Sequence, residues 1–291
     1  MIVVGVDSGG TSMRVAVFRD GHARDRAEGD GRSMRPGDGA ALAALIADLV
    51  RPLLLKGRTV RADALVVGAA GAGREAEQVE LRSALEETRL AWRTIVTTDA
   101  ELARAAAFGG GPGVLLIAGT GSIAVSRDGN GGTRRVGGLG WRMGDQGSAY
   151  WLGDQALKAV GAMHDGLGTV THLAEALCTA ARVPGIAGLI QWSTRATPAE
   201  VAALGPAVLA CADGGDAVAI GLRDDAVAEL VRLAAAAGAG RLPVALSGGL
   251  LSHDRRLGEL VAARLEADGA TVVRGGLDPC RGATFLAEPA L

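Results

Sequence analysis

A short internal repeat is the feature that most limits the fold of this sequence. Residues 15–21 read VAVFRDG and residues 123–129 read IAVSRDG. Each copy follows an apolar run and a turn rich in glycine and hydroxyl residues, at 7–12 and at 119–122. This pattern predicts two β-hairpins with tight glycine turns. We interpret the repeat as a duplicated domain that presents two similar hairpins from opposite sides of a cleft; the alternative is a chance similarity between short hairpins.

Apolar runs of strand length alternate with stretches of helical periodicity along the chain. The predicted strands lie at 2–6, 13–18, 64–67, 94–96, 114–117, 123–126, 244–246 and 271–273. The predicted helices lie at 39–55, 75–90, 101–108, 149–160, 170–181, 199–211, 217–237 and 255–267. This alternation favours an α/β protein with mostly parallel central sheets. Asp99 follows a strand and is expected to cap the next helix.

The composition indicates a globular protein and argues against several classes. At 291 residues the chain predicts about two domains, and 48% apolar residues suffice for packed cores. A net charge of −2 argues against a nucleic-acid partner held through its phosphates. Three widely spaced cysteines disfavour a disulfide framework or a zinc site. With no signal-peptide pattern and no apolar span free of glycine, we expect a cytoplasmic protein without membrane contact.

Both glycine-rich turns have the composition of a phosphate site. Glycine lets backbone N–H groups approach an anion closely, and threonine adds a hydroxyl donor. Asp7, at the end of the first strand, is placed to hold a magnesium ion. The candidate phosphate ligands are Gly9, Gly10, Thr11, Thr120, Gly121 and Ser122. The alternative interpretation is a pair of ordinary hairpin turns.

Other motifs limit the classes of enzyme to which the sequence could belong. The sequence has no P-loop motif and only two lysines, Lys56 and Lys158, which argues against a P-loop enzyme. Residues 71–76 match a dinucleotide fingerprint between a strand and a helix, so an NAD-dependent dehydrogenase stays open as a rival. Asp99 and Asp145 are candidates for binding hydroxyl groups, with helix capping as the alternative role of each. The turn at 247–249 could hold an adenine ring or a phosphate.

The order of these motifs resembles one family. The resemblance rests on Asp7–Thr11, Gly68–Gly73, Thr98–Ala100, Gly119–Ser122, Gly144–Trp151 and Ser247–Gly249, of which Gly144–Trp151 is the most specific. Together they are similar to the N-acetylglucosamine and glucosamine kinases of the BadF/BadG/BcrA/BcrD ATPase family, in the sugar kinase, Hsp70 and actin superfamily. The resemblance implies an α/β fold with two ribonuclease-H-like, actin-like ATPase domains around a cleft. The first would span 1–108, completed by 275–291, and the second 109–274.

The resemblance also implies roles for individual residues. Asp99 would bind the sugar and act as the catalytic base. The two glycine turns would hold the phosphates of ATP and its Mg²⁺, and Arg14 would add positive charge. The residues expected to contact the sugar are Gly138, Leu139, Gly140 and Asp145. Those expected along the adenosine are Ala202, Gly248 and Gly249. A homodimer is expected.

Two departures from the family pattern bear on the substrate. Gln146 stands where relatives often carry a glutamate. Residues 31–37 lack the asparagine that contacts the sugar in relatives, so either Ser33, Arg35 or a backbone group replaces it, or the preferred sugar lacks the group in question. Because Met34 cannot supply that hydrogen bond, Met34→Asn is expected to change the preference between N-acetylglucosamine and glucosamine. The alternative is that this loop only closes over the edge of the cleft.

The sequence therefore predicts an ATP- and magnesium-dependent kinase that phosphorylates an amino sugar, N-acetylglucosamine or glucosamine, at the 6-hydroxyl. Two alternatives from other classes stand beside the dehydrogenase. The first is an ATPase activator, the redox partner of a 2-hydroxyacyl-CoA or benzoyl-CoA enzyme, which would need cysteines for an iron–sulfur cluster. The second is a sugar sensor without catalysis, against which the presence of Asp99 argues.

Overall fold

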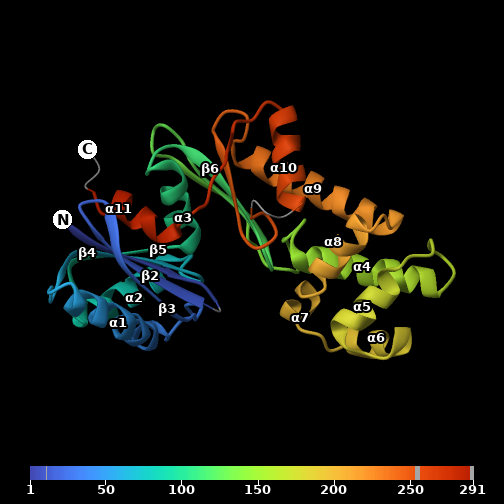
Figure 1. The fold of residues 1–291 in the computed structure, drawn as a ribbon, viewed down its shortest axis with the longest axis horizontal. Helices are drawn as coiled ribbons and strands as arrows, with labels where there is room; N and C mark the ends of the chain where they lie inside the picture. Colours follow the sequence, from blue (N-terminus) through green and yellow to red (C-terminus); the bar gives the residue numbers. More distant parts are fainter. Residues whose placement is uncertain (11, 253–255, 289–291) are drawn as a thin grey trace. The chain divides into compact units, whose positions relative to one another are not determined.

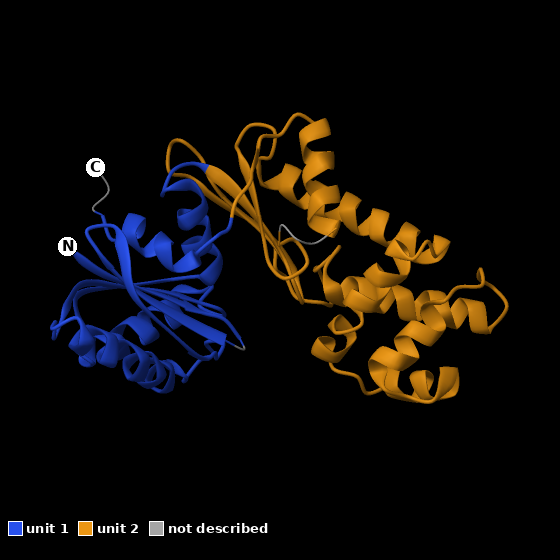
Figure 2. Cartoon of the chain, in the orientation of Figure 1, with its two compact units in different colours: residues 1–112, 276–291 blue, residues 113–275 orange. Residues whose placement is uncertain are grey.

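The computed structural model describes residues 1–10, 12–252 and 256–288. The chain divides into two compact units (Figure 2), of which unit 1 comprises 1–112 with 276–291 and unit 2 comprises 113–275. Within the described ranges, no single helix is both long enough and apolar enough to cross a membrane. Two bent pairs of consecutive helices meet that test by length and composition when each pair is taken together.

Unit 1 is built on a five-stranded sheet (Figure 1). Its strands are β1 (Ile2–Ser8), β2 (Ser12–Arg19), β3 (His22–Asp30), β4 (Ala62–Ala69) and β5 (Ala91–Thr97), in the order β3-β2-β1-β4-β5. The first three strands form an antiparallel meander, while β4 and β5 continue the sheet parallel to β1. Half of the pairings are therefore antiparallel, and the expectation of mostly parallel sheets is wrong.

Helices cover both faces of this sheet (Figure 1). One face packs against α1 (Gly39–Lys56) and α2 (Glu75–Glu87) around buried aliphatic side chains. The other face packs against α3 (Asp99–Phe108), the 3₁₀ helix η1 (Pro279–Arg281) and α11 (Gly282–Leu286). Alternate residues of a strand point to opposite faces, so β1 sends Val4 and Val6 to the first core and Val3 to the second.

Unit 2 repeats the same sheet. Its strands are β6 (Gly113–Ala118), β7 (Ser122–Arg127), β8 (Thr133–Gly137), β9 (Val244–Ser247) and β10 (Val272–Val273), in the order β10-β9-β6-β7-β8. Here too a three-stranded antiparallel meander is extended by two parallel strands. The repeated heptapeptides lie in β2 and β7, the middle strands of the two meanders. The predicted α/β class with two ribonuclease-H-like halves is thereby confirmed.

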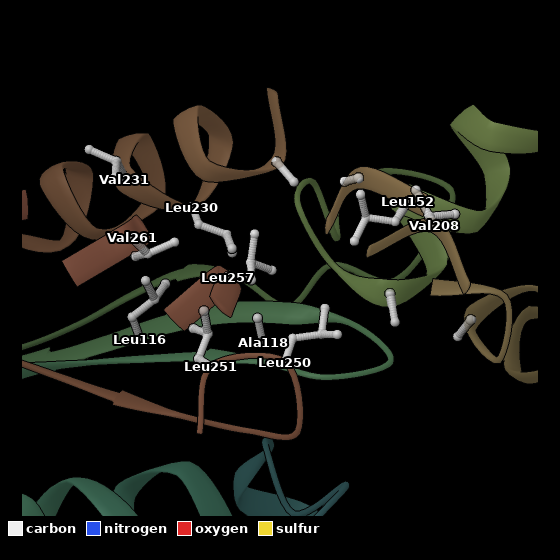
Figure 3. Packing of buried hydrophobic residues seen from close by; sticks show 14 of the residues in the cluster. Leu116, Ala118, Leu152, Val208, Leu230, Val231, Leu250, Leu251, Leu257 and Val261 are labelled. Atoms are coloured by element: carbon white, nitrogen blue, oxygen red, sulfur yellow. The ribbon is translucent and has the colours of Figure 1, made fainter. Parts of the chain in front are cut away.

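The helices of unit 2 form one large hydrophobic core with its sheet. They are α4 (Ala149–His164), α5 (Leu173–Ala181), α6 (Gly185–Ser193), α7 (Pro198–Ala202), α8 (Gly205–Asp213), α9 (Ala217–Ala237) and α10 (Arg256–Ala267). Figure 3 shows part of this core, where Leu116 and Ala118 of β6 belong to the same cluster as Leu230 of α9 and Leu257 of α10. The core fixes the end of β6, from which the next turn emerges.

Several elements differ from the sequence prediction for clear physical reasons. β3 and β8 were not predicted because both are polar edge strands without apolar alternation. The single helix predicted at 199–211 is split into α7 and α8, and Pro206, at the start of α8, lacks the N–H that a continuous helix needs. Asp99 is the first residue of α3, and Thr98 is its cap: the Thr98 hydroxyl accepts the Glu101 N–H at 3.1 Å.

Candidate functional site

The carboxyl ends of three neighbouring strands meet at one edge of the unit 1 sheet. Asp7 of β1 is level with Gly68 of β4, and Gly68 is level with Thr97 of β5. Asp99 follows two residues later, at the start of α3. The register thus gathers the two predicted carboxylates, Asp7 and Asp99, at the edge where α/β sheets bind ligands.

Asp99 is held by a firmly anchored helix. Its carboxylate accepts the N–H of Ala100 at 2.9 Å. Five residues further along α3, the fully buried Arg104 makes two 2.8 Å bonds to Glu101 and one of 2.7 Å to the Gly111 carbonyl. Separating a buried ion pair of this kind is costly, because it would leave a charged side chain buried without a partner. The start of α3 is therefore a rigid platform for Asp99.

The surroundings of Asp7 disfavour the ionised form of its carboxyl group. Burial raises the pKa of its carboxyl to about 6, and the negative charges of Asp99 and Asp278 push in the same direction. Arg14 lies opposite Asp7 on β2 and offsets part of this, with a guanidinium nitrogen 4.0 Å from the carboxylate. Arg14 is itself half-exposed and also 3.9 Å from Glu28. This edge of the sheet is short of positive charge.

Gly68 sets how closely α3 approaches the sheet. A Cβ at this position would lie 2.6 Å from the Cβ of Leu102, a fully buried residue of α3, and 3.1 Å from the Thr98 carbonyl. Gly68→Ala should therefore push α3 and Asp99 away from the strand, at about 1–3 kcal/mol of stability. Thermal unfolding checks this. Gly221→Ala is the matched control, since nothing lies within 4 Å of its added methyl group; an equal loss in both variants would contradict the packing argument.

The first glycine turn joins β1 to β2. The Gly9 N–H donates to the Ser12 carbonyl at 3.0 Å, and Gly10 is exposed. Segment 31–34 packs against this turn: a Cβ on Gly10 would lie 3.0 Å from the Ser33 hydroxyl, and one on Gly31 would overlap the Ser12 backbone. Ser33 thus neighbours the predicted phosphate turn. Thr11, predicted as a phosphate ligand, lies outside the described residues.

Met34 is a core residue, which corrects the expectation attached to it. Its side chain is 3% exposed among aliphatic residues between the sheet and α1, and its N–H donates to the Ala70 carbonyl at 2.7 Å. Met34→Asn would bury an amide in this core, so the expected result is a loss of stability of about 1–3 kcal/mol rather than a new sugar contact. Denaturant unfolding tests this against Met34→Leu, which conserves volume and should cost less than about 1.5 kcal/mol.

The second glycine turn, Gly119–Ser122, is hydrogen-bonded to the start of α4. The carbonyls of Gly119 and Thr120 accept the N–H groups of Ala149 and Tyr150 at the start of α4, at 2.9 and 3.2 Å. These bonds hold the turn against the N-terminal end of α4 and use the first two N–H groups of that helix. Thr120 is exposed and Gly121 is half-buried, so both are accessible from solvent.

Ser122 and Asp145 make hydrogen bonds that stabilise the turn itself. The Ser122 hydroxyl donates to the Gln146 carbonyl at 2.8 Å, and its N–H donates to Asp145 at 3.1 Å. Both donors of this buried residue are therefore used within the protein, and its predicted phosphate contact would require one of these bonds to break. Burial raises the pKa of Asp145, and the Ser122 bond opposes the shift. Asp145 packs on the turn so closely that a Cβ on Gly121 would lie 2.7 Å from its carboxylate.

The remaining residues predicted to contact the sugar lie in the loop after β8. The Gly138 N–H donates to the Ser122 carbonyl at 2.9 Å, which ties this loop to the glycine turn. Gly138 and Gly140 have φ values of +65° and +82°, a region that favours glycine. Leu139 between them is 63% exposed. The loop therefore presents backbone to solvent beside the turn, together with the apolar side chains of Leu139, Trp141 and Met143.

A cavity of about 550 Å³ opens next to this turn within unit 2. Its lining includes Thr120, Ala202 and Gly249, three of the residues predicted along the nucleotide. Gly248, also predicted there, has a φ of +91°, and a Cβ on it would overlap the Ala118 carbonyl. Its role is to let the loop after β9 close onto the end of β6, and Gly249 then reaches the cavity.

One wall of the cavity was not predicted. Pro206, Leu209, Ala210 and Asp213 of α8 line it, together with Arg256 and Leu257 of α10. The i, i+3, i+4, i+7 spacing on α8 was visible in the sequence, but such a stripe marks a core face as readily as a ligand face. Its position beside the glycine turn supplies the missing information.

A magnesium ion fits the unit 1 edge by charge. Within 1–10, 12–252 and 256–288, no group of three or more His, Cys, Asp and Glu residues is placed to hold a metal on its own. Magnesium is instead commonly held by one or two carboxylates together with substrate phosphates and water. Asp7, whose ionisation is opposed by Asp99 and Asp278, is the carboxylate that a cation would stabilise.

Comparisons with known proteins agree with this geometry. A relative named N-acetylmuramic acid/N-acetylglucosamine kinase, from Clostridium acetobutylicum, is 31% identical over 169 residues, which cover 57% of this chain and 55% of the relative. The chain thus spans little more than half the length of that relative. The glucosamine kinase GspK of Vibrio cholerae is 29% identical over 231 residues, 78% of this chain and 77% of that protein.

A solved structure extends the likeness to the whole fold. A protein assigned as an N-acetylglucosamine kinase from Chromobacterium violaceum has a TM-score of 0.79 and 27% identity, and the match covers 99% of both chains. A family model matches residues 4–287, nearly the full length. On this match, the chain belongs to the BadF/BadG/BcrA/BcrD ATPase family.

Proposed function

We propose that this protein is an ATP- and magnesium-dependent kinase that phosphorylates an amino sugar, N-acetylglucosamine or glucosamine, at the 6-hydroxyl. The observation that carries the proposal is the division of polar groups between the units. Unit 1 gathers Asp7 and Asp99 at one sheet edge, and unit 2 has a cavity that begins at the Gly119–Ser122 turn. The names of the relatives, all amino-sugar kinases, agree with it.

Each group has a defined task in the proposed reaction. Asp99 accepts the proton of the sugar hydroxyl. At the same time the hydroxyl oxygen bonds to the γ-phosphorus of ATP, and the bond from that phosphorus to ADP breaks. The N–H groups and hydroxyl around Thr120 and Gly121 donate hydrogen bonds to the phosphate oxygens. Asp7 would hold magnesium, which neutralises phosphate charge when it is bound with the nucleotide. Arg14 is placed to supply positive charge at the same edge.

The cysteines give no support to the iron–sulfur alternative. Burial raises the pKa of all three thiols, that of Cys280 to about 12. Cys178 and Cys280 are also buried, which withdraws them from a partner subunit. A sugar sensor without turnover would use the same ligand groups, and only catalysis separates it from a kinase.

An assay of sugar-dependent ADP release tests the proposal. The purified protein is incubated with ATP, Mg²⁺ and one sugar at a time: glucosamine, N-acetylglucosamine, N-acetylmuramate, glucose or a 2-keto sugar acid. We expect the highest kcat/KM with glucosamine or N-acetylglucosamine, and no release when Mg²⁺ is chelated. A clear preference for glucose or a sugar acid would contradict the proposed substrate class.

A further inference from the structure

The α8 wall of the unit 2 cavity is apolar at one end and carries a charged residue at the other. The face of α8 that lines it carries Pro206, Leu209 and Ala210, and then Asp213 at the end of the helix. Residues at this spacing share one side of a helix. The wall is therefore apolar over two turns and ends in a carboxylate.

The apolar end of this wall lies at the phosphate turn. A Cβ on Gly205, at the start of α8, would lie 3.0 Å from the Cβ of Ala149, and the Ala149 N–H bonds to the Gly119 carbonyl. From Pro206 the helix rises about 1.5 Å per residue, so Asp213 lies roughly 10 Å from Pro206 along the helix axis. A nucleotide whose phosphates occupy the turn would run along this wall and bring the far edge of its base to Asp213.

The cavity lining also offers apolar surface to the faces of a flat ring. Leu250 and Leu257 belong to it, and Figure 3 shows both beside the end of β6. Among the described residues that line the cavity, only Asp213 and Arg256 carry charge. A carboxylate only accepts hydrogen bonds, whereas a guanidinium only donates them. Asp213 is thus the charged acceptor that the lining offers to the N–H groups of a base.

The Asp213 carboxylate is not saturated by its ion pair. Its oxygen lies 3.9 Å from a guanidinium nitrogen of Arg223, which makes a shorter contact of 2.9 Å to Asp224. The side chain of Asp213 is 50% exposed. A carboxylate offers about four acceptor positions, so this long contact leaves room for a ligand.

We propose that Asp213 selects adenine by accepting a hydrogen bond from its 6-amino group. This inference rests on the proposed use of ATP and specifies how that nucleotide is recognised. Purine riboside has a hydrogen in place of the 6-amino group and no N–H on that edge, so it cannot make this bond. A site built to accept a hydrogen bond discriminates strongly against a base that cannot donate one.

The test uses Asp213→Leu, which keeps much of the volume of the side chain and removes both acceptor oxygens. Dissociation constants for ADP, purine riboside 5′-diphosphate and 2′-deoxy-ADP are measured by titration calorimetry with Mg²⁺ and without sugar. We expect the ratio of the purine riboside diphosphate to the ADP dissociation constant to fall at least tenfold, because the variant no longer distinguishes the two bases through the 6-amino group. Asp224→Leu is the matched control: it removes the other carboxylate beside Arg223, lies outside the cavity lining, and should leave the ratio unchanged.

The outcomes are distinct. An unchanged ratio in Asp213→Leu overturns the inference, as does a change confined to 2′-deoxy-ADP, which would place the carboxylate at the ribose. Failure of the wild-type protein to bind ADP overturns it as well. Adenine selection that depends on Asp213, found together with an absence of sugar phosphorylation, supports the inference and contradicts the proposed kinase function instead.

Discussion

Asp99→Asn is expected to lower kcat by about 10²- to 10⁴-fold, the usual loss when a general base is removed. The amide keeps the size and most of the hydrogen-bonding shape of the carboxylate, so the dissociation constant of the sugar should change little. This split between kcat and binding separates a proton acceptor from a residue that only holds the substrate. Steady-state kinetics and calorimetric sugar binding measure the two quantities.

Asp48→Asn is the matched control for this prediction. Asp48 is an exposed carboxylate on α1, which covers the opposite face of the sheet from α3. Its substitution should leave kcat and sugar binding unchanged. If Asp99→Asn keeps more than about half of the wild-type rate, Asp99 is not the base.

Asp7→Asn is expected to stabilise the protein while it abolishes magnesium-dependent turnover. Burial and neighbouring carboxylates raise the folded-state pKa of Asp7 from 3.8 to about 6, so its ionised form costs stability at neutral pH. A shift of that size corresponds to at most about 3 kcal/mol. The cost is absent below pH 4, grows as the pH rises to about 6, and is constant above that.

The stability gain of Asp7→Asn should therefore be present at pH 7–8 and vanish near pH 4, measured by urea unfolding in the presence of a chelator. Glu28→Gln provides the control, since Glu28 also lies beside Arg14 but is 80% exposed. In the wild-type protein, the same titration predicts that the apparent affinity for Mg²⁺ declines as the pH falls below about 6, because the proton and the cation compete for the Asp7 carboxylate. Equal stability of Asp7→Asn and the wild-type protein at pH 8 would contradict the buried-charge account.

The sequence identified the elements that are apolar and the turns that are rich in glycine, because both patterns are local. The repeat at 15–21 and 123–129 predicted a duplicated hairpin, and the two sheets share one strand order. The edge strands β3 and β8 could not be predicted from the sequence, because their stability comes from neighbouring strands rather than from their own apolar residues. Their contribution is visible only after the sheet is assembled.

The candidate site shows the same limit. Asp7 and Asp99 could be chosen from their places at strand ends, yet the pKa of Asp7 depends on Asp278, which is distant in sequence. Met34 adjoins the predicted sugar segment but points into the core. The use of both Ser122 donors by Asp145 and Gln146 likewise depends on a loop that folds back from later in the chain.

The central claim, phosphoryl transfer from ATP to the 6-hydroxyl of an amino sugar, is tested most directly by ³¹P NMR of a complete reaction. The protein, ATP, Mg²⁺ and glucosamine or N-acetylglucosamine are followed until ATP is consumed. We predict one sugar 6-phosphate for each ADP formed, with neither product in the Asp99→Asn protein over the same time. Formation of ADP and free inorganic phosphate without a sugar ester would contradict the account, as would a phosphate attached at another position of the sugar.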